Sequence, residues 1–115
     1  MVRAKSEQLV EFKCIRGGNG DTEVRDIVPG EAKLNGKGRL FAHMILEPGH
    51  SIGEHVHTGE SEIFYFLSGT GEYNDNGTVV AVHAGDTAVC SDGQKHSLKN
   101  TGSEPLDYIA LILYA

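Results

Sequence analysis

Tryptophan is absent from this chain, proline is scarce and no apolar segment is long. The 115 residues include three prolines, and nowhere do they reach the roughly eighteen consecutive apolar residues of a membrane-spanning helix. The charged start, Met1 to Gln8, lacks the apolar stretch of a secretory signal. Lys and Arg number 10 against 16 Asp and Glu, without the clustered cations that phosphate binding needs. We therefore expect a cytoplasmic protein that binds neither a membrane nor nucleic acid.

Cysteine is also scarce, with only Cys14 and Cys90. Neither has a metal-ligand residue type at CXXC spacing, and in a reducing compartment two such cysteines are more often free thiols than a disulfide. The alternative is a catalytic thiol, which requires an electropositive environment to favour the thiolate. We expect two free thiols.

Glycine, by contrast, is plentiful: 15 residues separate many short apolar runs. This pattern favours an all-β sandwich or barrel over helices. The chain is long enough for one domain with a single hydrophobic core. Turns are expected at Asn35–Gly36 and at Asp75 to Gly77, and a loop at Arg16 to Thr22. The expected strands include Gln8 to Ile15, Arg39 to Leu46, Glu72 to Asn74, Thr78 to His83, Asp86 to Cys90, His96 to Lys99 and Leu106 to Tyr114.

Two glycine-bounded blocks concentrate residue types that bind metals. The first contains Gly49, His55, His57, Glu62 and Gly69, and the second contains Gly85, Gly93, His96 and Asn100. Taken alone, a His-X-His pair is more often a surface feature, and Glu60 or Glu62 could be a solvated charge. Together, three imidazoles, one carboxylate and four framing glycines predict a mononuclear site for a divalent first-row metal.

The spacing also carries a geometric argument. Residues two apart on a strand project to one face, so His55 and His57 can hold one ion. Glu62 lies an odd number of positions beyond His57, which on a continuous strand would turn it to the opposite face. The segment between them must therefore interrupt the strand, and Gly59 is the residue best able to do so. His96 then arrives from a remote strand.

The two blocks resemble the paired motifs of the cupin superfamily, G(X)5HXH(X)3–4E(X)6G and G(X)5PXG(X)2H(X)3N. The first matches at every fixed position, and the second departs only at Ser91, where a proline usually fixes the backbone before the histidine strand. The resemblance covers about Gly38 to Leu113. It implies a double-stranded β-helix, or jelly-roll barrel, over residues 36–115, with residues 1–35 as an N-terminal strand or arm that packs on the barrel.

One divalent transition metal per chain is expected, held by His55, His57, Glu62 and His96. The carboxylate favours manganese or iron, while the imidazoles also suit nickel, zinc or copper. Four protein ligands on an octahedral ion leave up to two positions for water or a chelating substrate. We expect an enzyme (isomerase, decarboxylase or dioxygenase) that acts on a small oxygen-rich acid or sugar derivative. The alternative is a non-catalytic barrel that binds or senses a small ligand, because fold alone does not determine function.

Other candidate site residues rest on weaker patterns. His43 precedes the first block and is a candidate acid or base in the pocket, although a lone histidine is more often packed or exposed. Tyr73, Tyr108 and Tyr114 could offer a hydroxyl to a substrate, although tyrosines in short strands mostly pack.

Two expected strands are apolar on both faces. Ile63 to Leu67 and Tyr108 to Leu113 do not alternate with polar residues, as a half-exposed antiparallel strand normally would. One face of each can fill the barrel, whereas the other, with Ile63, Tyr65 and Leu67, needs a cover. A second subunit is the expected cover, which predicts a homodimer, as is frequent among similar small cupins. The alternative cover is the N-terminal strand of the same chain.

Overall fold

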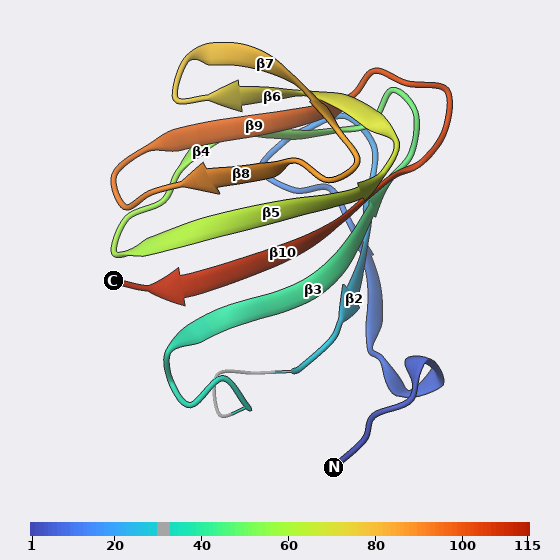
Figure 1. The fold of residues 1–115 in the computed structure, drawn as a ribbon, viewed down its shortest axis with the longest axis vertical. Coiled ribbons are helices and arrows are strands. Elements are labelled where there is room, and N and C mark those ends of the chain that lie inside the picture. The colour runs from blue at the N-terminus through green and yellow to red at the C-terminus, as the bar shows by residue number, and fades with distance from the viewer. Residues whose placement is uncertain (30–32) are drawn as a thin grey trace.

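Strands dominate the structure, a computed structural model that describes residues 1–29 and 33–115 (Figure 1). In chain order the described strands are β1 (Val10–Lys13), β2 (Thr22–Asp26), β3 (Gly38–Leu46), β4 (Ser51–Val56), β5 (Glu60–Ser68), β6 (Thr70–Asp75), β7 (Thr78–His83), β8 (Thr87–Cys90), β9 (Lys95–Asn100) and β10 (Leu106–Tyr114). A short 3-10 helix, η1 (Lys5–Glu7), precedes them. No helix in the described ranges is long and apolar enough to cross a membrane.

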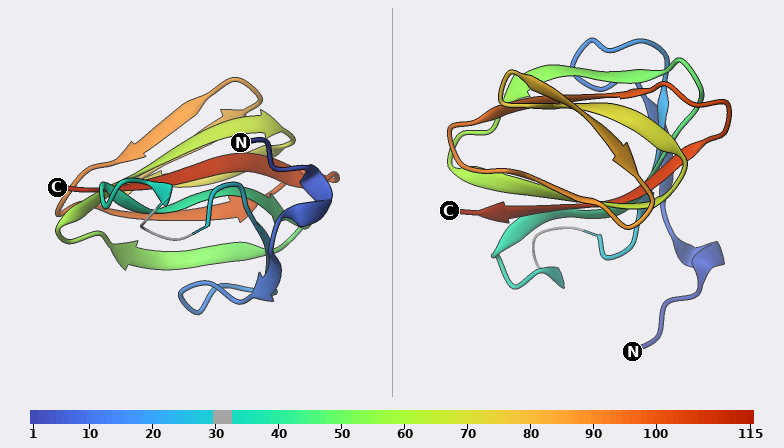
Figure 2. Two further views of the ribbon diagram at one scale, coloured as in Figure 1. Left: turned by 90° about the horizontal axis from the view of Figure 1, so that it is seen from below. Right: turned by 45° about the horizontal axis from the view of Figure 1, so that its top comes forward.

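The strands form two antiparallel sheets that face each other as the walls of a jelly-roll barrel (Figure 2). One sheet has the order β1-β2-β3-β10-β5-β8, and the other has the order β4-β9-β6-β7. This confirms the all-β, double-stranded β-helix predicted from the motifs. β1 and β2 extend the larger sheet beyond β3, and residues 30–32 of the expected N-terminal arm lie outside the described residues.

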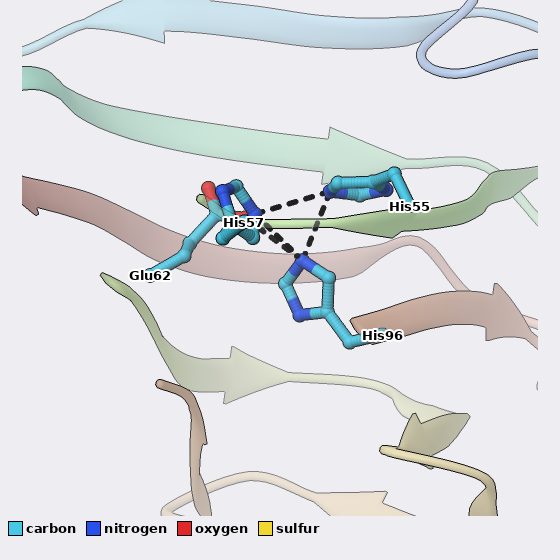
Figure 3. A group of neighbouring side chains, drawn as sticks. All are labelled: His55, His57, Glu62 and His96. Atoms are coloured by element: carbon cyan, nitrogen blue, oxygen red, sulfur yellow. Dashed lines mark hydrogen bonds and ion pairs between the residues drawn. The ribbon is translucent and has the colours of Figure 1, made fainter. Parts of the chain in front are cut away.

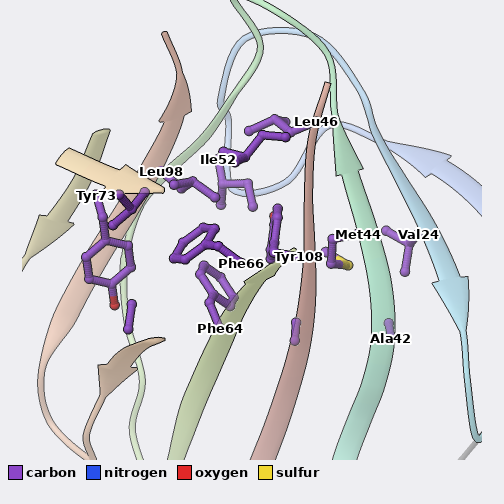
Figure 4. Packing of buried hydrophobic residues seen from close by; sticks show 14 residues of the cluster. Val24, Ala42, Met44, Leu46, Ile52, Phe64, Phe66, Tyr73, Leu98 and Tyr108 are labelled. Carbon is purple, nitrogen blue, oxygen red and sulfur yellow. The ribbon is translucent and has the colours of Figure 1, made fainter. Parts of the chain in front are cut away.

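Alternation along the long strands builds the core. In β5, Phe64 and Phe66 point inward and are buried, while Tyr65 and Leu67 point outward. The inward-facing side chains meet those of the opposite sheet in one cluster (Figure 4). The buried hydrophobic cluster contains Val24, Ala42, Met44, Leu46, Ile52, Phe64, Phe66, Tyr73, Val82, Ala88, Leu98, Leu106, Tyr108 and Ala110.

One strand was not expected from the sequence. β2 begins at Thr22, where the expected loop ends, and its inward residues Thr22 and Val24 are buried. The outward residues Glu23 and Arg25 are charged. Because only two side chains of this strand are buried, the alternation is too short to predict a strand from the sequence. The N-terminal strand is also shorter than expected, because β1 covers only Val10–Lys13.

The outer face of the larger sheet stays exposed. Tyr65 is 48% exposed, Leu67 43% and Val89, on the neighbouring β8, 49%. β1 does not cover this face, because it pairs with β2 at the far edge of the same sheet. The structure therefore contradicts the alternative in which the N-terminal strand covers β5.

Candidate metal centre

Four side chains, three from strands and one from the residue after a strand, converge inside the barrel (Figure 3). His55 lies in β4, His57 directly follows that strand, Glu62 lies in β5 and His96 in β9. β4 and β9 are neighbours, and His55 stands opposite His96 in their register. Between β4 and β5 the chain is interrupted at residues 57–59, where Gly59 has a φ of +74°. This interruption, predicted from the odd spacing, turns Glu62 toward the histidines.

The donor atoms of this group are closely spaced. The Nε2 atoms of His55 and His57 are 3.2 Å apart, those of His57 and His96 3.1 Å, and those of His96 and His55 3.0 Å. Glu62 Oε1 lies 3.0 Å from His57 Nε2 and 3.1 Å from His96 Nε2. All four donor atoms lie within 4.8 Å of one another. His57, Glu62 and His96 are buried, and His55 is half-buried.

The second ring nitrogen of each histidine has its own partner, which fixes the direction of the first. His55 Nδ1 lies 2.7 Å from the Gly53 carbonyl oxygen, and His57 Nδ1 lies 2.8 Å from Glu60 Oε1. Both partners are acceptors, so Nδ1–H donates and Nε2 carries a lone pair. His96 Nδ1 lies 2.8 Å from the Tyr73 hydroxyl, which can accept in the same way. Three imidazole lone pairs and a carboxylate oxygen then face one point, an arrangement that a cation stabilises.

The charges around this point match that requirement. Burial raises the pKa of Glu62, but His57 and His96, which donate to it whenever their Nε2 atoms carry a proton, outweigh burial and hold the pKa below its ordinary value. Burial lowers the pKa of His55 and favours its neutral ring. Metal binding requires the ionised carboxylate and the neutral imidazole. The Glu62 carboxylate raises the pKa of His57, so a proton competes with a cation at that nitrogen.

Behind His57 lies an ion pair that the sequence did not reveal. Glu60 accepts two hydrogen bonds of 2.7 Å from the Arg39 guanidinium in addition to the one from His57. The guanidinium is the main reason that the pKa of Glu60 falls to about 2. Glu60 therefore stays ionised and holds the His57 ring in place. The sequence signal for Glu60 was its position two residues before Glu62, which places both side chains on one strand face. Arg39 has no comparable signal among its neighbours in the sequence.

The turn of the second motif holds its shape without proline. The Ser91 amide donates to Gln94 Oε1 at 3.0 Å, and the Gln94 amide donates to the Ser91 carbonyl at 2.9 Å. A proline would lack the first of these donors. The Gly93 amide in the same turn donates to the His57 carbonyl at 2.7 Å. The second motif therefore positions a histidine of the first.

A cavity of about 320 Å³ opens beside His55, His57 and Glu62. Its walls are largely apolar, and three cations, Lys13, Arg16 and Arg39, take part in the lining. The lining residues are Lys13, Cys14, Ile15, Arg16, Val24, Arg39, Leu40, Met44, Ile52, His55, His57, Glu62, Phe64 and Ile112. A site of this size and character suits a small polar molecule held by a few convergent groups.

His43 does not reach this cavity. It lies on the outward face of β3, between the inward residues Ala42 and Met44, and its Nε2 is 3.1 Å from Asp107 Oδ2. The structure thus separates His43 from the four convergent residues, because alternation along the strand turns it to the other side of the sheet. Cys14 and Cys90 are free, as expected.

Comparisons with known proteins agree with this fold. The sequence matches the family model of the Cupin domain over residues 42–112, and the chain belongs to the cupin family. It is 44% identical over 113 residues to the oxalate-binding protein of Thermotoga maritima, with 98% of this chain and 93% of that protein covered.

Solved structures give the same result. A predicted oxalate decarboxylase from Thermotoga maritima superposes with a TM-score of 0.95 at 40% identity, with both chains fully covered. A putative sugar phosphate isomerase from Acidithiobacillus ferrooxidans has a TM-score of 0.80 at 19% identity, with 99% of this chain and 75% of that chain covered, and shares the fold.

Proposed function

We propose that this cupin binds one divalent metal ion through His55, His57, Glu62 and His96, and through that ion a small dicarboxylate such as oxalate. The observation that carries the proposal is the convergence of three imidazole lone pairs and one carboxylate beside a cavity with cationic lining residues. The family relationship supports the same ligand set. When bound, the metal supplies Lewis acidity and positions for chelating oxygens.

The spacing of the donor atoms supports six-coordinate binding. With metal–ligand bonds of about 2.1 Å, adjacent ligands of an octahedral ion lie about 3.0 Å apart, whereas those of a tetrahedral ion lie about 3.4 Å apart. Five donor pairs in this group are separated by 3.0–3.2 Å. The sixth pair, His55 and Glu62, falls within the 4.8 Å that spans the group. This spacing suits a six-coordinate ion, and the hard carboxylate among the ligands favours manganese or iron.

Oxalate is the ligand class that the relatives suggest. One similar protein is an oxalate-binding protein, and a similar structure is a predicted oxalate decarboxylase. Oxalate chelates through two oxygens, which matches the two positions that four protein ligands leave on a six-coordinate ion. Lys13 and Arg16 on the cavity wall add positive charge that favours a dianion.

Catalysis is the second candidate, and the cavity wall favours binding over it. Decarboxylation of oxalate releases carbon dioxide and must deliver one proton to the remaining carbon to give formate. The described residues that line the cavity include no carboxyl group apart from Glu62, which the metal would occupy. A carboxylic acid that could donate this proton is therefore missing from the wall, and the step would depend on another lining group such as Lys13 or Cys14.

Titration calorimetry on the manganese and iron forms tests the proposal. We expect one metal per chain and oxalate binding that disappears when the metal is removed. Mass spectrometry of the same mixtures, with and without oxygen, then distinguishes a binder from an enzyme, because formate or an oxidised product would establish turnover. A panel of keto acids, hydroxy acids and uronates covers the isomerase and dioxygenase alternatives. A metal-loaded protein that binds none of these acids would contradict the proposed ligand class.

We also propose that the exposed face of β5 is covered by a second copy of the chain. The outward side chains of Tyr65, Leu67 and Val89 are exposed beside the partly buried Ile63, and together they form an apolar surface on the described monomer. Burial of such a surface in a symmetric dimer is favourable.

A further inference from the structure

Arg16 occupies a backbone position that rarely holds arginine. It has a φ of +54°, Gly17 after it has a φ of +70°, and the Gly18 amide donates to the Ile15 carbonyl at 3.1 Å. A two-residue turn with positive φ at both central positions favours asparagine, aspartate or glycine at the first of them. An L-residue with a long side chain is strained there, and such strain concentrates at functional sites.

This turn is fixed against the strand that carries His55. The Gly53 amide of β4 donates to the Ile15 carbonyl at 3.2 Å. A Cβ on Gly53 would lie 2.0 Å from the Arg16 carbonyl oxygen, and a Cβ on Gly18 would lie 2.0 Å from the Ser51 carbonyl oxygen. The two backbones thus approach as closely as glycine permits. These contacts therefore fix the Arg16 backbone beside the cavity that the Arg16 side chain lines.

The charge of Arg16 is also available to a ligand. Arg39 is paired with Glu60, Arg25 with Glu23, and Arg3 donates to backbone carbonyls. Within residues 1–29 and 33–115, no acidic side chain pairs with Arg16. Lys13, the neighbouring cation of the wall, lies 3.5 Å from Glu11. Among the residues that the structure describes, Arg16 is thus the cavity arginine without a carboxylate partner.

The cavity offers more room than oxalate fills. Its volume of about 320 Å³ corresponds to roughly ten water molecules at about 30 Å³ each. Oxalate has only two carbons and four oxygens. Apolar side chains, among them Ile15, Leu40 and Ile52, line the same space. A ligand that fills it needs a short carbon body beyond the group that chelates the metal.

We propose that Arg16 determines ligand specificity by pairing with a second carboxylate, placed beyond the chelating group of a small hydroxy or keto dicarboxylate. The inference rests on the proposed metal-dependent binding of a small acid and narrows its ligand class. A planar guanidinium recognises a carboxylate through two parallel hydrogen bonds. Such a pair gives a cavity lined by both metal-ligand residues and the Arg16 guanidinium a preference for a ligand with two carboxylates.

Two matched 2-hydroxy acids test this assignment. L-malate and L-lactate share the chelating head, and only malate has the second carboxylate. Calorimetry on the metal-loaded protein should give malate about a tenfold higher affinity than lactate. In Arg16→Asn this preference should fall to about one, because the malate affinity drops while the lactate affinity stays unchanged. The metal content should not change.

Thermal unfolding of the metal-free variant supplies an independent readout. Asparagine suits the positive φ of position 16 better than arginine, so Arg16→Asn should unfold at the same or a higher temperature. Lys99→Gln is the matched control, because Lys99 is exposed on β9 and does not line the cavity, and it should change the malate preference less than twofold. An unchanged preference in Arg16→Asn, or wild-type protein that binds oxalate but prefers lactate to malate, would overturn the role of Arg16 and leave the proposed function standing. Wild-type protein that binds no metal, or none of the acids, would refute both the role of Arg16 and the proposed function.

Discussion

At the residue scale, the site depends on side chains that never touch the metal position. Glu60 and Tyr73 each contact the Nδ1 atom of a histidine whose Nε2 atom faces the centre. Such contacts orient a ligand and fix its tautomer, and their loss commonly lowers metal affinity about 10-fold to 100-fold. The effect of Glu60 and Tyr73 on metal affinity can be measured separately from the effect of the four donor residues.

The donor residues give the plainest prediction. His57→Ala or His96→Ala should abolish metal binding while the barrel still folds, since the core cluster is otherwise intact. Glu62→Gln keeps the size but removes the charge, and should lower metal retention more than it lowers the unfolding temperature. Elemental analysis of protein purified without an affinity tag is the measurement. Equal metal in the wild type and these variants would refute the ligand assignment.

Tyr73→Phe tests the orientation of His96. The variant removes the hydroxyl 2.8 Å from His96 Nδ1, so we expect metal affinity to fall about 10-fold or more. Tyr108→Phe is the matched control, because the described residues offer the buried Tyr108 hydroxyl no hydrogen-bond partner. Removal of that hydroxyl should leave metal affinity unchanged and raise stability, since an unsatisfied buried group is lost. Competition against a chromogenic chelator measures both, and equal affinities in the two variants would contradict the role of Tyr73.

At the level of secondary-structure elements, two positions near the site require glycine for different reasons. Gly59 allows the break between β4 and β5 through its φ of +74°, and no atom lies within 4 Å of a Cβ added there. Gly53 instead allows the close approach of the turn at Arg16. Gly59→Ala should therefore lose only about 1 kcal/mol of unfolding free energy, the cost of the left-handed backbone. Gly53→Ala should lose more, because its Cβ meets a backbone oxygen that must move. Urea unfolding of the two variants checks this order, and a smaller loss in Gly53→Ala would contradict it.

At the scale of the whole molecule, the exposed face of β5 predicts a dimer. Each Å² of apolar surface removed from water contributes about 25 cal/mol, and an aspartate at Tyr65 would place a charge in that interface. Tyr65→Asp should therefore be monomeric where the wild type is dimeric. Val79→Asp is the control, because Val79 is 64% exposed on β7 of the other sheet. Light scattering at micromolar concentration measures the oligomeric state of each protein. A monomeric wild type would contradict the proposed interface.

The barrel, the four convergent residues and the interruption at Gly59 could all be predicted from residue types and their spacing along the chain. These features depend on short spacings, in which period two and one positive φ decide where a side chain points. Three other features are visible only in the folded chain: His43 faces outward, Arg39 pairs with Glu60 and Arg16 lines the cavity. Such contacts depend on which strands become neighbours and in what register, which the packing of the two sheets settles through residues far apart in the chain.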